Sequence, residues 1–320
     1  MFSSEKSVDQ QPLYTREILN NIEAELANDG VFITLQRSSG NSIGSFNMCR
    51  GGKVGASGLG PLKKRTGNIV AFHDERTFQK LKSEGRLEQY FPVVNVTTTF
   101  KGPNQTEEET RKMFEEFLFR FEASDEGIAI ANLIKTELKG RAINKVIAFG
   151  MGCIGIVDQG PFQSYYEHAA ALVVAKAAGE VSSCPNVTLL VQDPLYTDVC
   201  KKVLREFGFG VIEGFGAKGF ALVDDSTIVL AHNPEFPVRE IIADIARPAL
   251  ICMKKEEPAN ATGIVLPLPD DRADVDSVRS RKMLQEYRSV SLPGAASAFW
   301  ENTWYIRESS LRTKIKALKI

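Results

Sequence analysis

The chain has 320 residues, a length that fits one large domain or two ordinary ones. Its 39 basic and 40 acidic side chains nearly balance, which gives no reason to expect binding to nucleic acid or to an anionic membrane. No apolar run is long enough for a membrane span, and the N-terminus lacks the apolar core of a signal peptide. We therefore expect a cytoplasmic protein. An additional nuclear location stays open. The five scattered cysteines and three histidines predict no metal site and no disulfide framework.

The first 122 residues predict an N-terminal α/β elaboration. A capped helix is expected over 15–29, strands over 31–35, 68–72 and 91–100, and a long Gly-rich loop over 37–67. The next helix, over 106–123, begins with acidic residues. It carries one apolar stripe, formed by Met113, Phe114, Phe117, Leu118 and Phe121.

From about residue 127 the pattern changes to alternating helices and apolar strands. Helices are expected over 128–139, 163–180, 197–208 and 237–246, and strands over 145–150, 187–194, 210–214, 226–232 and 248–253. Such alternation is typical of a Rossmann-like, mostly parallel sheet with helices on both faces. We assign 123–320 to this core, with a charged surface excursion at 254–290 that carries one helix. The segment 298–308 should pack back on the body.

Three glycines, Gly150, Gly152 and Gly155, follow the strand at 145–149 with the spacing G-x-G-x-x-G. Such a turn lets the backbone approach the phosphates or ribose of a cofactor. The helix does not begin at once, because Pro161 delays it, and an acid 20 residues further on is missing. The same glycines also fit a turn required by packing alone.

Asp193 ends the next strand, where a carboxylate can accept hydrogen bonds from ribose hydroxyls. Pro194 stops the strand, and Tyr196 should lie at the mouth of the sheet beside the ligand. A plain strand-to-helix turn is the alternative interpretation.

His232 follows another apolar strand and should reach the same edge, where it is our candidate catalytic base. His168 lies inside an Ala-rich helix and is expected to have a packing role. The segment 51–60 resembles a phosphate-binding loop but departs from the required pattern. The basic C-terminal segment 311–320 is expected to dock on its own domain rather than on a membrane.

Four segments of the core have familiar sequences and together cover 145–253: "VIAFGMGCIG", "SYYEHAAAL", "VQDPLYTDVCKKVLREFGF" and "STIVLAHNPEFPVREIIADIARPALI". In this order they resemble the Sensitivity to Red light Reduced family, in its fungal branch. The resemblance implies a Rossmann-like core and links to light and circadian signalling, haem metabolism or cytoskeletal stability, without an assigned reaction. Many relatives have Pro-His-Cys where this chain has Ala-His-Asn, so a thiol or metal role there is not implied.

Three functions remain open at this point. The first is a regulatory protein that binds a nucleotide-type ligand, S-adenosylmethionine or an NAD-type cofactor, with Gly150, Gly152, Gly155, Asp193 and Tyr196 around it. The second is a methyltransferase-like or oxidoreductase enzyme with His232 as its catalytic residue. The third is a haem-handling protein or a module that only binds other proteins.

Overall fold

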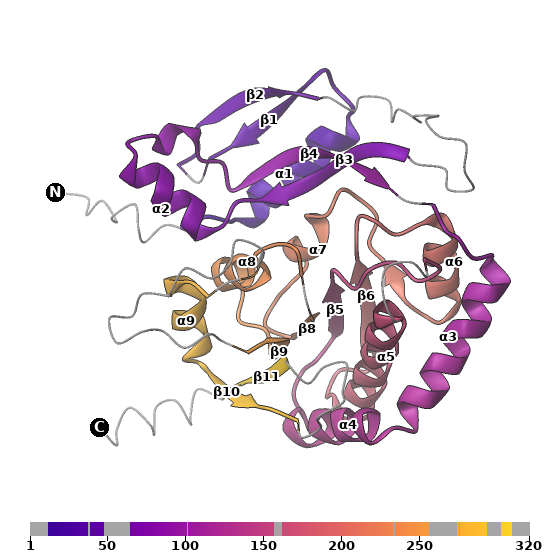
Figure 1. The fold of residues 1–320 in the computed structure, drawn as a ribbon. Helices are drawn as coiled ribbons and strands as arrows, with labels where there is room; N and C mark the ends of the chain where they lie inside the picture. The colour runs from indigo at the N-terminus through magenta and orange to yellow at the C-terminus, as the bar shows by residue number, and fades with distance from the viewer. Residues whose placement is uncertain are drawn as a thin grey trace, which may run out of the picture.

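The computed structural model describes most of the chain (Figure 1). The described residues are 12–37, 39–47, 65–100, 102–156, 162–232, 234–255, 274, 276–292 and 302–308. The glycine-rich segment 51–60, Pro161, the middle of the charged excursion and the basic segment 311–320 lie outside them.

The central element is a seven-stranded sheet in the order β10-β11-β9-β8-β5-β6-β7. Its strands are β5 (Lys145–Phe149), β6 (Thr188–Gln192), β7 (Gly210–Val211), β8 (Thr227–Ala231), β9 (Leu250–Lys254), β10 (Tyr287–Val290) and β11 (Asn302–Arg307). Neighbouring strands from β9 to β7 run parallel, whereas β11 is antiparallel to both β9 and β10. The expected α/β fold with a mostly parallel sheet is confirmed.

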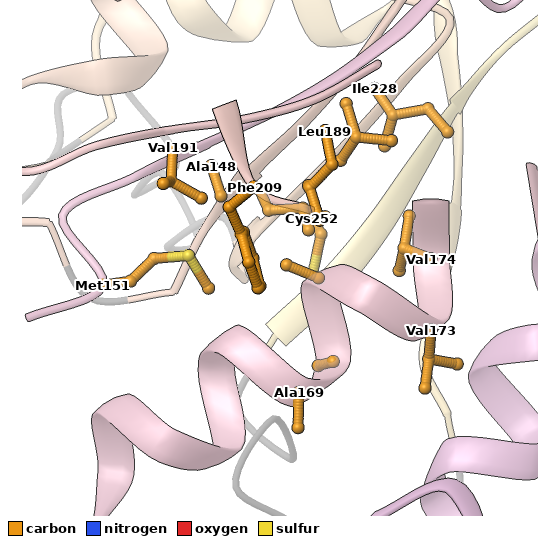
Figure 2. Close-up of a cluster of buried hydrophobic side chains, with 14 of the residues drawn as sticks. Ala148, Met151, Ala169, Val173, Val174, Leu189, Val191, Phe209, Ile228 and Cys252 are labelled. Carbon is orange, nitrogen blue, oxygen red and sulfur yellow. The ribbon is translucent and has the colours of Figure 1, made fainter. Parts of the chain in front are cut away.

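Helices cover one face of the sheet, because alternate strand residues such as Val146 and Ala148 point toward them. These helices are α3 (Glu107–Glu122), α4 (Asp125–Glu137), α5 (Gln163–Val181) and α6 (Asp198–Glu206). Figure 2 shows the apolar side chains between α5 and the strands, with Val174 and Cys252 among them. No helix in the described part of the chain is both long and apolar enough to cross a bilayer.

The other face buries Ile147, Phe149, Val229 and Ile251. The short helix α7 (Lys218–Ala221), α8 (Val238–Ile245) and α9 (Val278–Leu284) belong to this side. The sheet therefore has helices on both faces, as expected.

The N-terminal elements form an additional layer beside α7 and α8 (Figure 1). They are α1 (Arg16–Ala27), β1 (Phe32–Gln36), β2 (Ser42–Phe46), β3 (Arg65–Phe72), α2 (Glu75–Ser83), the 3₁₀ turn η2 (Leu87–Gln89) and β4 (Val93–Phe100). Two antiparallel pairs result, β1 with β2 and β3 with β4.

Buried polar contacts join this layer to the core. The backbone N–H groups of Leu13 and Tyr14 donate to Asp244 on α8, and the N–H of Glu75 donates to Glu240. Glu23 on α1 accepts from the N–H groups of the turn that leads into α7. The N-terminal layer and the sheet therefore share one apolar core.

Two strands lie where the sequence predicts loop or excursion. β2 occupies part of the expected 37–67 loop, and four of its five residues are exposed, so its sequence lacks a buried face that periodicity could reveal. β10 lies within 254–290 at the edge of the large sheet, together with the expected helix α9. The aromatic segment near the C-terminus packs back as β11, with Trp304 buried.

Candidate functional site

The order of the strands reverses between β5 and β8. From β5 the chain passes through α5 to β6 on one side, whereas β8 lies on the other side and continues to β9. Because ligands of open parallel sheets bind outside the carboxyl ends of the strands at such a point, this edge is the candidate site. The glycine turn follows β5 and His232 follows β8, so both predicted groups reach it.

The glycine turn depends on backbone conformations that favour glycine. Gly150, Gly152 and Gly155 have φ values of 64°, 68° and 86°. A Cβ on Gly155 would lie 2.9 Å from Oγ1 of Thr110 on α3, so this position also requires the absence of a side chain. The turn is therefore fixed both by its conformation and by its close packing.

All three glycine amides donate hydrogen bonds within the protein. Gly150 N–H donates to the Gln192 carbonyl, and Gly152 N–H donates to Oδ2 of Asp193 at 2.9 Å. The N–H of Gly155 donates to the phenol oxygen of Tyr165 at 3.1 Å. These amides therefore stabilise the turn itself, and each of the three already has an acceptor within the protein.

Asp193 lies beside the turn, as expected, and joins two backbone segments. Its Oδ2 accepts from Gly152, and its Oδ1 accepts from the N–H of Leu195 at 2.9 Å. Each carboxylate oxygen has a second lone pair, so Asp193 retains some capacity to accept from a ligand. Desolvation raises the pKa of Asp193, and the negative charge of Glu235 raises it further.

Tyr196 is placed differently from the expectation, because its phenol is turned inward. Its O–H donates to Nε2 of His168 at 2.8 Å, and both residues are buried. The Nδ1–H of His168 donates to the Ser164 carbonyl, since a carbonyl only accepts. Burial lowers the pKa of His168 to about 4, which keeps the ring neutral near pH 7. The Tyr196–His168 pair thus anchors α5 to the loop after β6, and His168 has the packing role expected of it.

His232 contacts two side chains from other elements. Asn302, the first residue of β11, donates from Nδ2 to Nδ1 of His232 at 2.7 Å. The other ring nitrogen, Nε2, lies 3.9 Å from Oε1 of Glu167 on α5. The structure therefore brings together residues from α5, β8 and β11 at one edge of the sheet.

Glu167 is the site residue that the sequence interpretation missed. Its side chain is only 6% exposed, and its Oε1 also accepts from Gln163. Burial raises its pKa to about 8, and the charge of Asp193 adds to that effect. The sequence does contain a signal for Glu167. The many alanines and valines around it indicate that this helix is buried over much of its surface, and a glutamate in such a helix is uncommon without a partner.

Half-buried aromatic rings lie next to the glycine turn. A Cβ on Gly150 would lie 3.5 Å from the ring of Phe236. The centroid of that ring is 5.9 Å from Phe72 on β3 and 5.7 Å from Phe220 on α7. The N-terminal layer therefore contributes an aromatic ring close to the edge where β5 and β8 end.

A family model describes the part of the chain that carries this site. The model named SRR1 domain matches residues 120–255, from the last turn of α3 to just beyond β9. This match places an SRR1 domain at residues 120–255. Within it lie the glycine turn, Glu167, Asp193 and His232, whereas Asn302 lies beyond its C-terminal boundary.

No curated protein matches this chain, whereas several solved structures are similar to it. Among solved structures, a cofactor-bound protein from MTB, Rv0187, has 13% identity and a TM-score of 0.36, over 63% of this chain and 91% of that one. A precorrin-6y C5,15-methyltransferase from Geobacter metallireducens GS-15 has 11% identity and a TM-score of 0.28, over 55% and 85%. MtNAS in complex with MTA and tNA has 14% identity and a TM-score of 0.31, over 63% and 76%.

Proposed function

We propose that this chain is a regulatory protein of the fungal branch of its family, and that its SRR1 domain binds a nucleotide-type small molecule. The observation that carries the proposal is the position of the glycine turn and His232 on the two sides of the strand-order reversal between β5 and β8. We assign ligand binding to 123–320, with the N-terminal elaboration covering one side of the site through Phe72.

The charges around the site favour a cationic ligand over an anionic one. The carboxyl groups of Glu235 and Asp193 act on one another, and Asp193 acts on Glu167. A diphosphate would be repelled by the carboxylates of Glu235 and Asp193, and the glycine amides that could bind it already donate within the protein. We therefore place S-adenosylmethionine, whose sulfonium is positively charged, ahead of an NAD-type cofactor.

The aromatic rings beside Gly150 support a ligand with a planar base. Phe236 and Phe72 are half-buried, so an edge or face of each ring is available for contact. Stacking of a base on an aromatic side chain contributes about 1–3 kcal/mol. The adenine of S-adenosylmethionine satisfies this requirement, and its sulfonium satisfies the charge requirement.

A thermal-shift series tests the proposal with S-adenosylmethionine, S-adenosylhomocysteine, NAD, NADP and haem. A ligand at 100 times its dissociation constant should stabilise the protein by about 2.7 kcal/mol. We expect the largest shift with S-adenosylmethionine and a smaller one with S-adenosylhomocysteine, which lacks the positive charge. No shift with either adenosyl compound would refute the proposal.

A charge variant makes this test sharper. Glu235 is exposed, so Glu235→Gln should leave folding intact and weaken binding of S-adenosylmethionine by about threefold. Glu116→Gln is the matched control, because Glu116 is also exposed, pairs with Arg120 on α3 and should not change the affinity. Equal affinities in the wild type and in Glu235→Gln would contradict the electrostatic argument.

Haem binding is the alternative that this series also examines. His168 is buried and both of its ring nitrogens have partners within the protein, so it is poorly placed to ligate haem iron. His232 would have to release Asn302 in order to bind iron through Nδ1. A Soret band that is lost in His232→Gln would favour the haem function over the adenosyl ligand.

A further inference from the structure

Three side chains at the sheet edge are arranged to bind one ligand atom that both accepts and donates a hydrogen bond. They are Glu167, His232 and Asn302. The 3.9 Å between Nε2 of His232 and Oε1 of Glu167 is too long for a direct hydrogen bond. One oxygen atom within hydrogen-bond distance of both would bridge them. Both side chains are largely buried, with 14% and 6% exposed, so such an oxygen would be held away from bulk water.

Asn302 determines what the bridging atom must be. Its Nδ2 donates to Nδ1 of His232, so Nδ1 is an acceptor and the proton of the neutral ring is on Nε2. Nε2–H therefore donates toward the bridging atom, whereas the carboxylate of Glu167 accepts from it. An atom that must accept one hydrogen bond and donate another is an oxygen that carries a proton, either in a hydroxyl group or in a water molecule whose place a ligand hydroxyl group can take.

We propose that Glu167 and His232 bind a hydroxyl group of the ligand, with Glu167 as the acceptor of its proton and Asn302 as the residue that positions the His232 ring. The proposal rests on the proposed function only for the identity of the ligand. In the step, the hydroxyl proton passes to Oε1 of Glu167, and the electron pair of the O–H bond stays on the oxygen. The Nε2–H of His232 then stabilises the negative charge on that oxygen.

The electrostatic surroundings of Glu167 fit such a role. Its raised pKa of about 8 means that both protonation states are accessible near neutral pH. The ionisable groups that interact with it come from several elements: Asp193 after β6, Tyr196 before α6, Cys252 on β9 and His232 after β8. A second observation also points to a ligand: Oδ1 of Asn302 is buried and has no partner among the described residues.

Nitrogen-15 NMR tests the geometry without any ligand, because the chain has only three histidines. We expect His232 to be the Nε2–H tautomer when neutral, and His168 to be the Nδ1–H tautomer without titration between pH 5.5 and 9. His232→Gln and His73→Gln assign the signals. A neutral His232 with its proton on Nδ1 would overturn the proposal, even if a Glu167 variant failed to fold.

Two glutamate variants on α5 test the coupling. In the wild type, the nitrogen signals of His232 should respond to the ionisation of Glu167 near pH 8, and this response should be absent in Glu167→Gln. Glu180→Gln is the matched control, because Glu180 lies on the same helix in an exposed ion pair with Lys135. A response of His232 near pH 8 that persists in Glu167→Gln, in a variant with a native circular-dichroism spectrum, would refute the pair.

The source of the hydroxyl group is tested with named probes, with His232 signals as the readout. Adenosine is compared with 2′-deoxyadenosine and 3′-deoxyadenosine, and separately with phenol. If the hydroxyl belongs to a ribose, one deoxy compound should bind at least tenfold more weakly than adenosine in the wild type but not in Glu167→Gln. If it belongs to a second substrate, phenol should shift the His232 signals and both deoxy compounds should bind like adenosine.

The two proposals fail in different ways. Loss of adenosyl binding with intact coupling between Glu167 and His232 would refute the proposed function and leave the proton-accepting pair. Adenosine binding with no response of His232 to any hydroxyl compound would refute the hydroxyl site and leave the proposed function.

Discussion

Oδ2 of Asp193 accepts a hydrogen bond from the N–H of Gly152 at 2.9 Å and thereby joins the ends of β6 and β5. The same carboxylate accepts from Leu195 through its other oxygen. One side chain therefore fixes the conformation of both loops beside the point where the strand order reverses. Its first role is to hold the site in shape, and contact with a ligand is a second role that the free lone pairs permit.

Asp193→Ala should destabilise the protein by about 2 kcal/mol, because two backbone N–H groups lose their acceptor. Urea denaturation at pH 7 measures the change. Asp198→Ala is the control, since Asp198 is an exposed residue in the first turn of α6 and should contribute about 0.5 kcal/mol. Equal effects of the two substitutions would show that Asp193 does not support the turn.

Gly155→Ala should be more destabilising than Gly140→Ala. Both glycines have positive φ, at 86° and 73°, so alanine costs about 1 kcal/mol at either position. Only at Gly155 would the new Cβ meet a neighbour, Oγ1 of Thr110 at 2.9 Å, whereas space at Gly140 is open. We expect a difference of about 1–2 kcal/mol in thermal or urea unfolding. Thr110→Ala in the Gly155→Ala background should recover part of it, and no recovery would contradict the steric explanation.

Tyr196→Phe should cost about 1–2 kcal/mol, because Nε2 of the buried His168 loses its donor. The measurement is the free energy of unfolding in urea. Tyr166→Phe is the control, because Tyr166 lies on α5 like His168 but at a half-buried position, and this substitution should change stability by less than about 0.5 kcal/mol. A neutral result for Tyr196→Phe would mean that the phenol does not hold His168 in place.

Glu167 should make stability fall as the pH rises. Its folded-state pKa, about 8, is above the ordinary value of 4.5, so the folded protein binds the proton more tightly than the unfolded chain. The resulting stabilisation is complete below pH 4.5 and is lost progressively up to pH 8, by at most about 1.4 kcal/mol per pH unit. Urea unfolding between pH 5 and 9 should show this slope in the difference between wild type and Glu167→Gln. A flat difference would mean that Glu167 is ionised in the folded protein throughout that range.

Much of the core was predictable, because alternating apolar strands and amphipathic helices encode burial directly. β5, β6, β8 and α5 lie close to their expected bounds for this reason. β2 was not predictable, since most of its residues are exposed and its pairing with β1 depends on the hairpin and not on a buried face.

The site was predictable in position but not in its contacts. Parallel strands bring Gly152, Asp193 and His232 to one edge, and periodicity reveals those strands. Periodicity does not show which way a phenol points, so Tyr196 was expected at the ligand and is found against His168. Nor does it show that Asn302, 70 residues beyond His232, would lie beside it through the return of β11 to the sheet.

The contacts of Glu23 affect how the protein should be prepared for ligand screens. Its carboxylate fills a turn in which the amides of Phe215, Ala217 and Lys218 converge, next to Gly214 and Gly216 with positive φ. Such converging amides attract anions. A shortened chain without α1 would expose them to sulfate, phosphate or the phosphates of any nucleotide in the buffer. Nucleotide binding seen only with such a fragment would then report the missing helix rather than the ligand of the intact chain.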